Sequence, residues 1–599
     1  MTTPFVNRRD LAFQLFEALD VEALTARPRF ADHSRDTFLS ALDAALAIAT
    51  EKFAPHNRAA DEHEPTLEGG RVRLLPAVKE ALDAYVEAGF LSAARDYQVG
   101  GMQLPCTVSR ACQAVFSAAN AATTSYVSLT AANANLLAAF GTEAQKRRWL
   151  PHLLSGRFFG TMALNEPQAG SSLADLRTTA TPLPDGTWSI TGTKTFISAG
   201  DHDLSENIVH LVLARIQGAP AGVKGISLFL VPKIRVGDDG RLGEPNDVAL
   251  AGLFHKMGWR GTTSTQLAFG ENGRCVGELV GPPHQGLACM FHMMNEARIG
   301  VGLAAVMLGT AGYLQARDYA RERPQGRPPG SRDPASPQVP IVRHADVRRM
   351  LLAAKAYVEG GLALCLQAAR LVDEQETGAT PEARADAAAL LDLLTPVVKA
   401  WPAQFCLEAS SLAIQVHGGY GYTREYPVEQ LYRDNRLNPI HEGTNGIQGL
   451  DLLGRKVHAG GGRSLELLGS AIARDAGAAA GDPVRGPLAE ALTGAFARLR
   501  ATTRRLAEAQ ARDPELGLAH SSAYLEAFGH VVVAWTWLRQ AGAAARGLAS
   551  AAGDERDFYE GKLAACRWFY RWELPRAVTL LGILDTLDTT CLEARPSWF

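Results

Sequence analysis

Residues 415–448 read QVHGGYGYTREYPVEQLYRDNRLNPIHEGTNGIQ, and this stretch carries the most information about the chain. It predicts a helix that ends at a pair of glycines, then a turn, a short helix, and Glu442 directly before Gly443. A glycine beside a carboxylate lets the backbone approach a ligand closely. Thr444 and the neighbouring amides can donate to a polyanionic cofactor, or they can cap the helix that begins IQGLDLLGRK. The spacing of these residues leaves both interpretations open.

The periodicity of the apolar residues divides the chain into four parts. Residues 1–160 place apolar side chains at three- and four-residue intervals, which is typical of amphipathic helices. Residues 161–285 contain short segments rich in Val, Ile, Leu and Phe, which indicate a β domain. A helical pattern returns in residues 286–460 around a proline-rich loop, and a further helical segment fills residues 461–599. We therefore expect a mainly α protein with a central β domain.

The composition excludes several classes of protein. A formal net charge of −3 gives no reason to expect binding to nucleic acid or another polyanion. None of the eight cysteines belongs to a CxxC pair, so no metal site is expected. The chain has no uninterrupted apolar run of about 18 residues, and its N-terminus lacks the apolar core of a signal peptide. We therefore expect a cytoplasmic protein without a membrane span.

Two other segments, together with residues 415–448, resemble the acyl-CoA dehydrogenase family. Residues 140–176, FGTEAQKRRWLPHLLSGRFFGTMALNEPQAGSSLADL, resemble the family's GT-x-x-QK and TEP-x-AGSD block. KTFISAG, at residues 194–200, resembles the family's segment beside the flavin ring. The resemblance covers about residues 80–460 in the correct order. The proline-rich loop and the additional C-terminal helices resemble the long bacterial subgroup that includes 3-methylmercaptopropionyl-CoA dehydrogenases.

This resemblance implies a fold and a reaction. The fold would comprise a helical N-terminal domain, a β-barrel middle domain, a four-helix bundle and an extra C-terminal helical domain, with the boundaries given above. The protein would be an oxidoreductase of fatty acid metabolism, a flavoprotein that uses FAD to convert an acyl-CoA to the trans-2-enoyl-CoA. Glu442 would remove the α-proton, and the β-hydride would pass to flavin N5. An electron-transfer flavoprotein would then accept the electrons.

The resemblance also assigns residues to the cofactor and the substrate. The contacts to FAD would come from Leu164, Asn165, Gly170, Ser171, Phe196, Ser198, Arg323, Gln415, Gly418, Gly419, Thr444 and Gly446. The contacts to the substrate would come from Ser171, Asn295, Arg298 and Gly443. Arg323 would reach the pyrophosphate of a neighbouring subunit's FAD, and residues 415–419 would meet its adenine end. These contacts imply a homo-oligomer, and we expect a homodimer because the extra C-terminal helices could cover the surface that tetrameric relatives use.

Several positions depart from the family pattern. Asn165 stands in place of a threonine, Phe196 in place of a tryptophan, and Ser172 in place of an aspartate. Asparagine keeps hydrogen-bonding capacity and phenylalanine keeps an apolar ring, so FAD binding is expected to survive. The RPQG segment is shorter than the family's R-x-x-FG, which leaves open that Arg323 is only a solvated residue at a helix end.

Some relatives carry their base on a different helix, at the position before an arginine that corresponds to Arg298. That position is Ala297 in this chain and cannot accept a proton. Glu296 is adjacent, but a step of ~100° round the helix is expected to turn it away from the substrate. The sequence therefore favours Glu442 as the base. His441 is interpreted as a packing or hydrogen-bonding residue.

Two other functions stay open. An acyl-CoA oxidase would pass its electrons to oxygen, and oxygen access depends on packing that a sequence does not reveal. A nucleic-acid-binding flavoprotein relative with little dehydrogenase activity would need a basic C-terminal segment. Residues 461–599 contain 16 Lys and Arg against 16 Asp and Glu, which does not favour this alternative.

Overall fold

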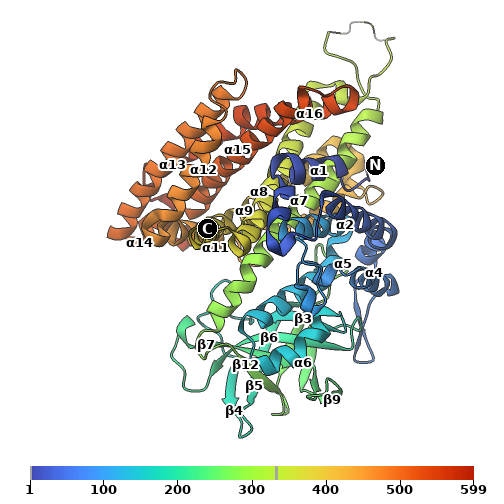
Figure 1. Ribbon diagram of the computed structural model, residues 1–599, viewed down its shortest axis with the longest axis vertical. Coiled ribbons are helices and arrows are strands. Elements are labelled where there is room, and N and C mark those ends of the chain that lie inside the picture. Colours follow the sequence, from blue (N-terminus) through green and yellow to red (C-terminus); the bar gives the residue numbers. More distant parts are fainter. Residues whose placement is uncertain (1–2, 331–332, 334) are drawn as a thin grey trace. The chain divides into compact units, whose positions relative to one another are not determined.

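The computed structural model describes residues 3–330, 333 and 335–599, apart from the side chains of residues 292–295. The chain forms two compact units (Figure 1). The helical unit comprises Met1–Leu39, Pro105–Ala114 and Val301–Phe599, and the sheet unit comprises Ser40–Leu104 and Val115–Gly300. The boundaries between them fall within or next to three helices, α2 (Arg35–Ile48), α5 (Cys106–Phe140) and α7 (Gly286–Glu322).

An eight-stranded sheet forms the centre of the sheet unit. Its strands follow the order β10-β11-β5-β12-β7-β6-β3, and β4 pairs with both β5 and β6. Strands β5, β12, β7, β6 and β4 therefore form a closed ring, as in a β-barrel. The pairing is parallel between β3 and β6 and between β4 and β6, and antiparallel elsewhere. The strands are β3 (Phe158–Ala163), β4 (Thr179–Pro182), β5 (Trp188–Ser198), β6 (Asn207–Ile216), β7 (Ile226–Pro232), β10 (Val248–Leu253), β11 (Ser264–Phe269) and β12 (Val276–Val280).

Both faces of β6 are buried, which explains why most of its residues are apolar. Val209, Leu211 and Leu213 belong to a core that also contains residues of α5, α6 (Glu143–Leu154) and the first turns of α7. Val212 and Ala214 belong to a second core with residues of β5, β7 and β11. Successive side chains of a strand point to opposite faces, so a strand covered on both sides is apolar at most of its positions.

The other elements of the sheet unit are two hairpins and short helices. Thr142 and Gln145 start α6 with a capping box, in which each side chain accepts a hydrogen bond from the other's backbone N–H. The hairpins pair β1 (Thr66–Glu68) with β2 (Arg71–Arg73), and β8 (Ile234–Val236) with β9 (Leu242–Pro245). The remaining helical segments are η4 (Ala49–Phe53), η5 (Ala54–His56), α3 (Asn57–Glu62), α4 (Pro76–Glu87), η6 (Phe90–Ser92), η7 (Tyr97–Val99) and η8 (Val223–Gly225).

Two long helices, α8 (Ala345–Thr377) and α9 (Pro381–His417), form the centre of the helical unit. Thr380 caps α9 by accepting a hydrogen bond from the Ala383 N–H, and Pro381 occupies the first helical position. The short helices after α9 are η10 (Gly418–Tyr422), α10 (Val428–Asn435), α11 (Asn445–Gly454) and η11 (Lys456–Gly462). The N-terminal segment and the link to α8 contain α1 (Arg8–Ala12), η1 (Phe13–Ala18), η2 (Val21–Ala26), η3 (Pro28–Phe30) and η9 (Ile341–Arg343).

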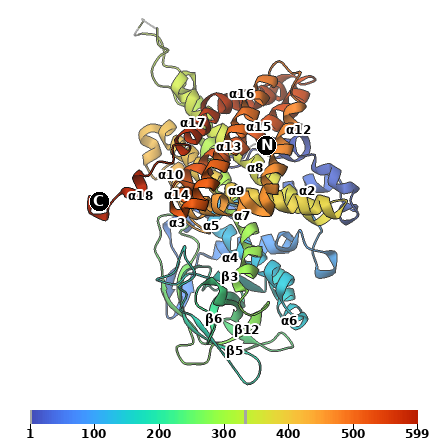
Figure 2. The same ribbon diagram turned by 90° about the vertical axis from the view of Figure 1, so that its left-hand side faces the viewer.

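The C-terminal helices pack against α8, α9 and α11 within the same unit (Figure 1 and Figure 2). Trp537 donates its indole N–H to the Ala356 carbonyl at 3.1 Å, and Gly360 leaves room for its ring. The fully buried Lys562 ammonium pairs with Asp10 near the N-terminus and, at 2.8 Å, with Glu359 of α8. The C-terminal elements are α12 (Arg463–Gly477), α13 (Gly486–Arg512), α14 (Pro514–Leu518), α15 (Ser521–Leu548), α16 (Gly553–Trp572), α17 (Leu574–Leu584), α18 (Thr590–Glu593) and η12 (Pro596–Trp598).

The expectation of a mainly α protein with a central β domain is confirmed. Among the described residues, α7 and α8 are long and apolar enough to cross a membrane by length and composition alone. Most of each apolar segment is buried inside the fold, as in an ordinary core helix, so these two helices are weak evidence for a membrane span.

Candidate active site

Glu442 and Gly443 form a tight turn directly before α11. Both residues adopt left-handed backbone conformations, with φ of +52° and +83°. Thr444 caps α11, because its Oγ1 accepts a hydrogen bond from the Ile447 N–H at 3.2 Å. The interpretation of Thr444 as a helix cap is therefore confirmed. The turn at Glu442 and Gly443 is attached directly to this capped helix start. A non-glycine residue is uncommon in the left-handed region, so the conformation of Glu442 must be maintained by its surroundings.

A buried chain of hydrogen bonds supports the segment before this turn. Asn435 Nδ2 donates to the carbonyls of Ala305 and Cys406, both at 3.1 Å. Asn438 Nδ2 donates to Asn435 Oδ1 at 2.9 Å, and His441 Nε2 bonds Asn438 Oδ1 at 3.1 Å. The sequence analysis did not identify this chain, although the spacing of its members at three-residue intervals in NRLNPIH is a signal for it.

His441 is a neutral hydrogen-bonding residue. Burial, and secondarily the charge of Lys399, lower the pKa of His441 to about 3. The Asn438 oxygen accepts from the imidazole N–H, because the Asn438 amide nitrogen is already donating to Asn435. The packing interpretation of His441 is supported, and no positive charge on this ring acts on Glu442 at neutral pH.

In the sheet unit, the loop after β3 is tied to β5. Lys194 Nζ donates to the Leu164 carbonyl at 3.0 Å and pairs with Glu166 at 2.9 Å. The Thr195 N–H donates to the Asn165 carbonyl at 3.0 Å. The two residues assigned to the flavin therefore have their carbonyls engaged by β5, and the loop is held in a defined position.

Glu166 closes this loop and was missed by the sequence analysis. Its carboxylate accepts hydrogen bonds from the Arg177 N–H at 2.7 Å and from the Thr178 N–H and hydroxyl at 3.0 and 2.6 Å. Burial alone would raise the pKa of Glu166, but Lys194 and these donors lower it to about 2. Burial lowers the pKa of Lys194 to about 8, against the attraction of Glu166. The sequence offered one signal for this role, because the carboxylate of Glu166 directly follows Asn165, a residue assigned to the flavin.

Phe196 offers an exposed aromatic surface at an irregularity in the sheet. The register of β5 against β11 shifts between Ile197 and Lys194, and Phe196 adopts φ of +56° there. Phe196 is 61% exposed, and its ring stacks on Phe254 with 4.5 Å between ring centroids. Ser198 is also exposed and lies opposite Ser264. A β-bulge of this kind redirects a side chain out of the sheet, and here it presents a ring on which a flat ligand can lie.

The other predicted residues of the sheet unit lie in a loop and in α7. Gly170 and Ser171 are exposed in the loop that Glu166 closes. Arg298 is buried, and its guanidinium carbon lies 5.9 Å from the centre of the Phe291 ring. The Asn295 side chain lies outside the described residues. The Glu296 carboxylate accepts a hydrogen bond from Asn135 Nδ2 of α5.

A pocket of 420 Å³ in the helical unit brings together three of the predicted FAD residues. Arg323 follows the end of α7, and Gly418 and Gly419 follow the end of α9. The lining residues are Tyr319, Arg323, Gln325, Ile341, Val416, His417, Gly418, Gly419, Tyr420 and Thr423. Gln415 does not line the pocket, but its carbonyl accepts the Gly418 N–H that ends α9.

The pocket combines aromatic rings with a cation. The Tyr319 and His417 rings stack with 4.4 Å between centroids, and Arg323 lies 5.8 Å from the centre of the Tyr420 ring. Aromatic faces bind a flat base, and a guanidinium binds phosphate oxygens. The pocket is therefore suited to an adenine nucleotide. Among the described residues, no group of three or more His, Cys, Asp or Glu is arranged to hold a metal ion.

Models of known families match four consecutive parts of the chain. These are the acyl-CoA dehydrogenase N-terminal domain at residues 39–157, the middle domain at 161–271, the C-terminal domain at 284–457, and an acetyl-CoA dehydrogenase C-terminal-like domain at 468–595. The chain belongs to the acyl-CoA dehydrogenase family.

Full-length relatives agree with this assignment. The chain is 38% identical to 3-methylmercaptopropionyl-CoA dehydrogenase of Ruegeria pomeroyi, over 94% of each chain. It is 36% identical to the broad-specificity linear acyl-CoA dehydrogenase FadE5 of Mycobacterium tuberculosis, over 98% of each chain. A solved acyl-CoA dehydrogenase from Bacillus anthracis, complexed with FAD, superposes with a TM-score of 0.73 at 19% identity, covering 95% of this chain and 93% of the other.

The family fixes the general activity of this acyl-CoA dehydrogenase. It is an oxidoreductase that uses FAD to dehydrogenate an acyl-CoA, as the sequence motifs predicted. The described residues fit FAD, because the sheet unit exposes the Phe196 ring beside an anchored loop and the helical unit contains a pocket suited to an adenine nucleotide.

Proposed function

We propose that Glu442 is the base that removes the α-proton of the acyl-CoA thioester. The observation that carries this proposal is the conformation of Glu442, whose left-handed backbone is held between a buried hydrogen-bond chain and the capped start of α11. A residue held in an unusual conformation on rigid support is characteristic of a functional site. The alternative position on α7 is Ala297, and the neighbouring Glu296 carboxylate is engaged by Asn135.

The α-CH of a thioester is a very weak acid, so a carboxylate alone is not sufficient to remove its proton. The negative charge that develops on the thioester oxygen must be stabilised by donors, and one such donor is worth ~3 kcal/mol. We propose the backbone N–H of Glu442 as a donor to that oxygen. FAD supplies the acceptor for the β-hydride, at N5 of its flavin ring. Glu442 therefore has to hold and remove one proton only.

We propose that the residues predicted from the family motifs bind the cofactor and the substrate. Phe196 and the anchored loop at Leu164 and Asn165 would lie against the flavin ring. Ser171, Arg298 and Gly443 would contact the acyl-CoA. Arg323 would reach the pyrophosphate of a neighbouring subunit's FAD, residues 415–419 would meet its adenine end, and the enzyme would be a homodimer. An electron-transfer flavoprotein would be the electron acceptor, and the cytoplasm would be the location of the enzyme.

A panel of acyl-CoAs with an artificial electron acceptor identifies the acyl group. The panel runs from short thioether and branched chains to long linear ones, because two of the full-length relatives carry the names of a thioether acyl-CoA and of linear acyl-CoAs. Peroxide is measured in the same assays. If peroxide forms in proportion to the substrate oxidised, the enzyme is an acyl-CoA oxidase and not a dehydrogenase.

The role of Glu442 is tested by Glu442→Gln, which keeps the shape of the side chain and removes the proton acceptor. We expect acyl-CoA oxidation to fall by at least ~10²-fold, the usual effect of losing a general base. The matched control is Glu296→Gln, which is expected to keep nearly normal activity. The reverse outcome, an active Glu442→Gln and an inactive Glu296→Gln, would move the base to α7.

A further inference from the structure

Gln448 binds the backbone of the turn that carries Glu442. Its side-chain Nε2 donates to the Glu442 carbonyl at 3.3 Å and to the Gly443 carbonyl at 3.4 Å. Gln448 is 0% exposed, and its Oε1 accepts no hydrogen bond from the residues that the structure describes. The two carbonyls are therefore the contacts that orient this buried amide.

Because Gly443 has no side chain, it leaves room for the Gln448 amide. A Cβ atom at position 443 would lie 2.5 Å from Gln448 Nε2, which is closer than real contacts allow. The φ of +83° at Gly443 also disfavours any residue with a side chain. The glycine after Glu442 thus has two functions, a left-handed conformation and space for the Gln448 side chain.

The helix that carries Gln448 is fixed on a second helix. A Cβ at Gly449 would lie 2.7 Å from the Ser521 carbonyl oxygen at the start of α15. The backbones of α11 and α15 are therefore in close contact at this point, and α11 has little freedom to move. Gln448 reaches the turn from a rigid support, which is what accurate placement of a reacting group requires.

We propose that Gln448 is a positioning residue for Glu442. A peptide group is planar and trans, so holding the Glu442 carbonyl towards Gln448 directs the Gly443 N–H the opposite way. Holding the Gly443 carbonyl as well fixes the next peptide plane, and together these contacts set the direction in which Glu442 leaves the backbone. This inference rests on the proposed role of Glu442 and extends it to a residue that does not touch the substrate.

The test is Gln448→Met, which removes both donors while keeping a similar volume. We expect the rate constant for flavin reduction at saturating acyl-CoA to fall about 10- to 100-fold, with the dissociation constant of the acyl-CoA nearly unchanged, because small misplacements of a reacting group have effects of this size. In a Glu442→Gln background, the same substitution should cause no further loss, because Gln448 acts through Glu442. Gly443→Ala, which displaces the amide and also strains the turn at a proposed substrate contact, should slow flavin reduction at least as much as Gln448→Met.

Gln540→Met is the matched control, because this buried glutamine of the same unit bonds Gln14 and Lys562 instead. It should lower stability and leave flavin reduction normal. Normal reduction in Gln448→Met, an equal loss with and without the Glu442 carboxylate, or loss of FAD from both Gln448→Met and Gly443→Ala would each overturn the proposal. Normal reduction in Glu442→Gln alone would instead overturn the proposed role of Glu442.

Discussion

At the scale of single residues, Glu166 and Lys194 determine how the predicted flavin loop is held. The pair is almost completely buried, with side chains 2% and 0% exposed, and Lys194 also binds the Leu164 carbonyl. A buried ion pair stabilises a fold only if both partners and their hydrogen bonds remain in place. Removing one partner leaves the other charge buried without compensation.

We predict that Glu166→Gln lowers the free energy of unfolding by ~3–5 kcal/mol at neutral pH, as expected for a broken buried pair, and weakens FAD binding. The folded-state pKa of Glu166, about 2, lies below its ordinary value of 4.5. Its contribution is therefore complete above pH ~4.5 and is lost as the pH falls towards 2. In urea unfolding of wild type and Glu166→Gln across this pH range, the difference between their free energies of unfolding should become smaller as the pH falls.

The control for this prediction is Asp175→Asn, an exposed acid in the same loop, which should change stability little. A difference between wild type and Glu166→Gln that stays constant from pH 7 to pH 3 would contradict the role of the ionised carboxylate.

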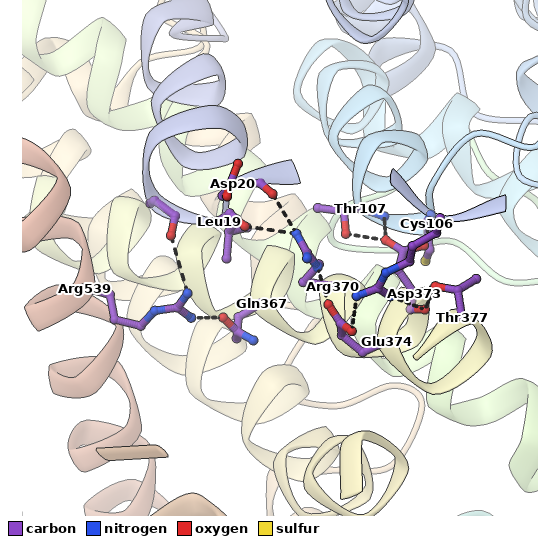
Figure 3. A network of polar contacts seen from close by, with 12 residues as sticks. Leu19, Asp20, Cys106, Thr107, Gln367, Arg370, Asp373, Glu374, Thr377 and Arg539 are labelled. Carbon is purple, nitrogen blue, oxygen red and sulfur yellow. Dashed lines mark hydrogen bonds and ion pairs between the residues drawn. The ribbon is translucent and has the colours of Figure 1, made fainter. Parts of the chain in front are cut away.

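At the scale of elements, α8 connects the N-terminal segment to the first turn of α5. Arg370 of α8 donates to the Leu19 and Asp20 carbonyls, each at 3.0 Å (Figure 3). Asp373, also of α8, lies beside the start of α5 (Figure 3). Its carboxylate accepts hydrogen bonds from the Cys106 N–H at 2.6 Å and from the Thr107 N–H and hydroxyl at 3.0 and 2.6 Å. A carboxylate from one helix thus caps another, which satisfies donors that α5 cannot pair internally.

We predict that Asp373→Asn lowers the free energy of unfolding by about 1–3 kcal/mol, because one amide oxygen cannot accept from all of these donors. Burial raises the pKa of Asp373 to about 6, although Thr107 and Cys106 oppose this. Because the folded-state pKa of Asp373 lies above its ordinary value of 3.8, the folded state binds a proton between about pH 4 and 6. The contribution of Asp373 to the free energy of unfolding is therefore largest below pH ~4 and is lost as the pH rises through 6. In urea titrations, the free energy of unfolding of wild type should therefore exceed that of Asp373→Asn by more at pH 4 than at pH 7.

Asp346→Asn, on an exposed turn of the same helix, is the control and should show no such pH dependence. If the difference in unfolding free energy between wild type and Asp373→Asn becomes smaller towards pH 4, the raised pKa of Asp373 is contradicted.

The elements themselves were largely predictable, because their signals are local. The switch from three- and four-residue periodicity to short β segments identified the central sheet, and the EGT motif with Thr444 identified the capped start of α11. The contacts that hold the site were not predictable in the same way. Asn435 bonds Ala305 and Cys406, and Asp373 bonds Thr107, across 130, 29 and 266 positions of sequence. No local pattern encodes which distant backbone a buried polar side chain will meet.

At the scale of the whole molecule, the proposed dimer depends on the Arg323 pocket. Arg323, Gly418 and Gly419 line one hollow together with stacked aromatic rings, although 95 positions separate Arg323 from Gly418 in the sequence. The short RPQG segment left open that Arg323 was only a solvated residue. Arg323 is exposed and lines this pocket, so its assignment to FAD stays a prediction, and Gln415 does not line the pocket.

We predict that the enzyme sediments as a homodimer and that Arg323→Ala weakens FAD binding by about 10-fold or more, because a guanidinium bonded to phosphate contributes roughly 1.5–3 kcal/mol. The dimer itself should persist in this variant. Arg321→Ala, in the last turn of α7, is the control and should bind FAD normally. Sedimentation of an active, FAD-loaded monomer would rule out a cofactor site completed by a second subunit.

The central claim, that Glu442 is the base, is tested most directly by anaerobic single-turnover reduction of the bound flavin. Wild type and Glu442→Gln are mixed with saturating acyl-CoA, and the loss of flavin absorbance is followed in time. We predict that both proteins bind the acyl-CoA and perturb the flavin spectrum, but that reduction in Glu442→Gln is slower by at least ~10²-fold. Reduction of Glu442→Gln at a rate near that of wild type would contradict the claim.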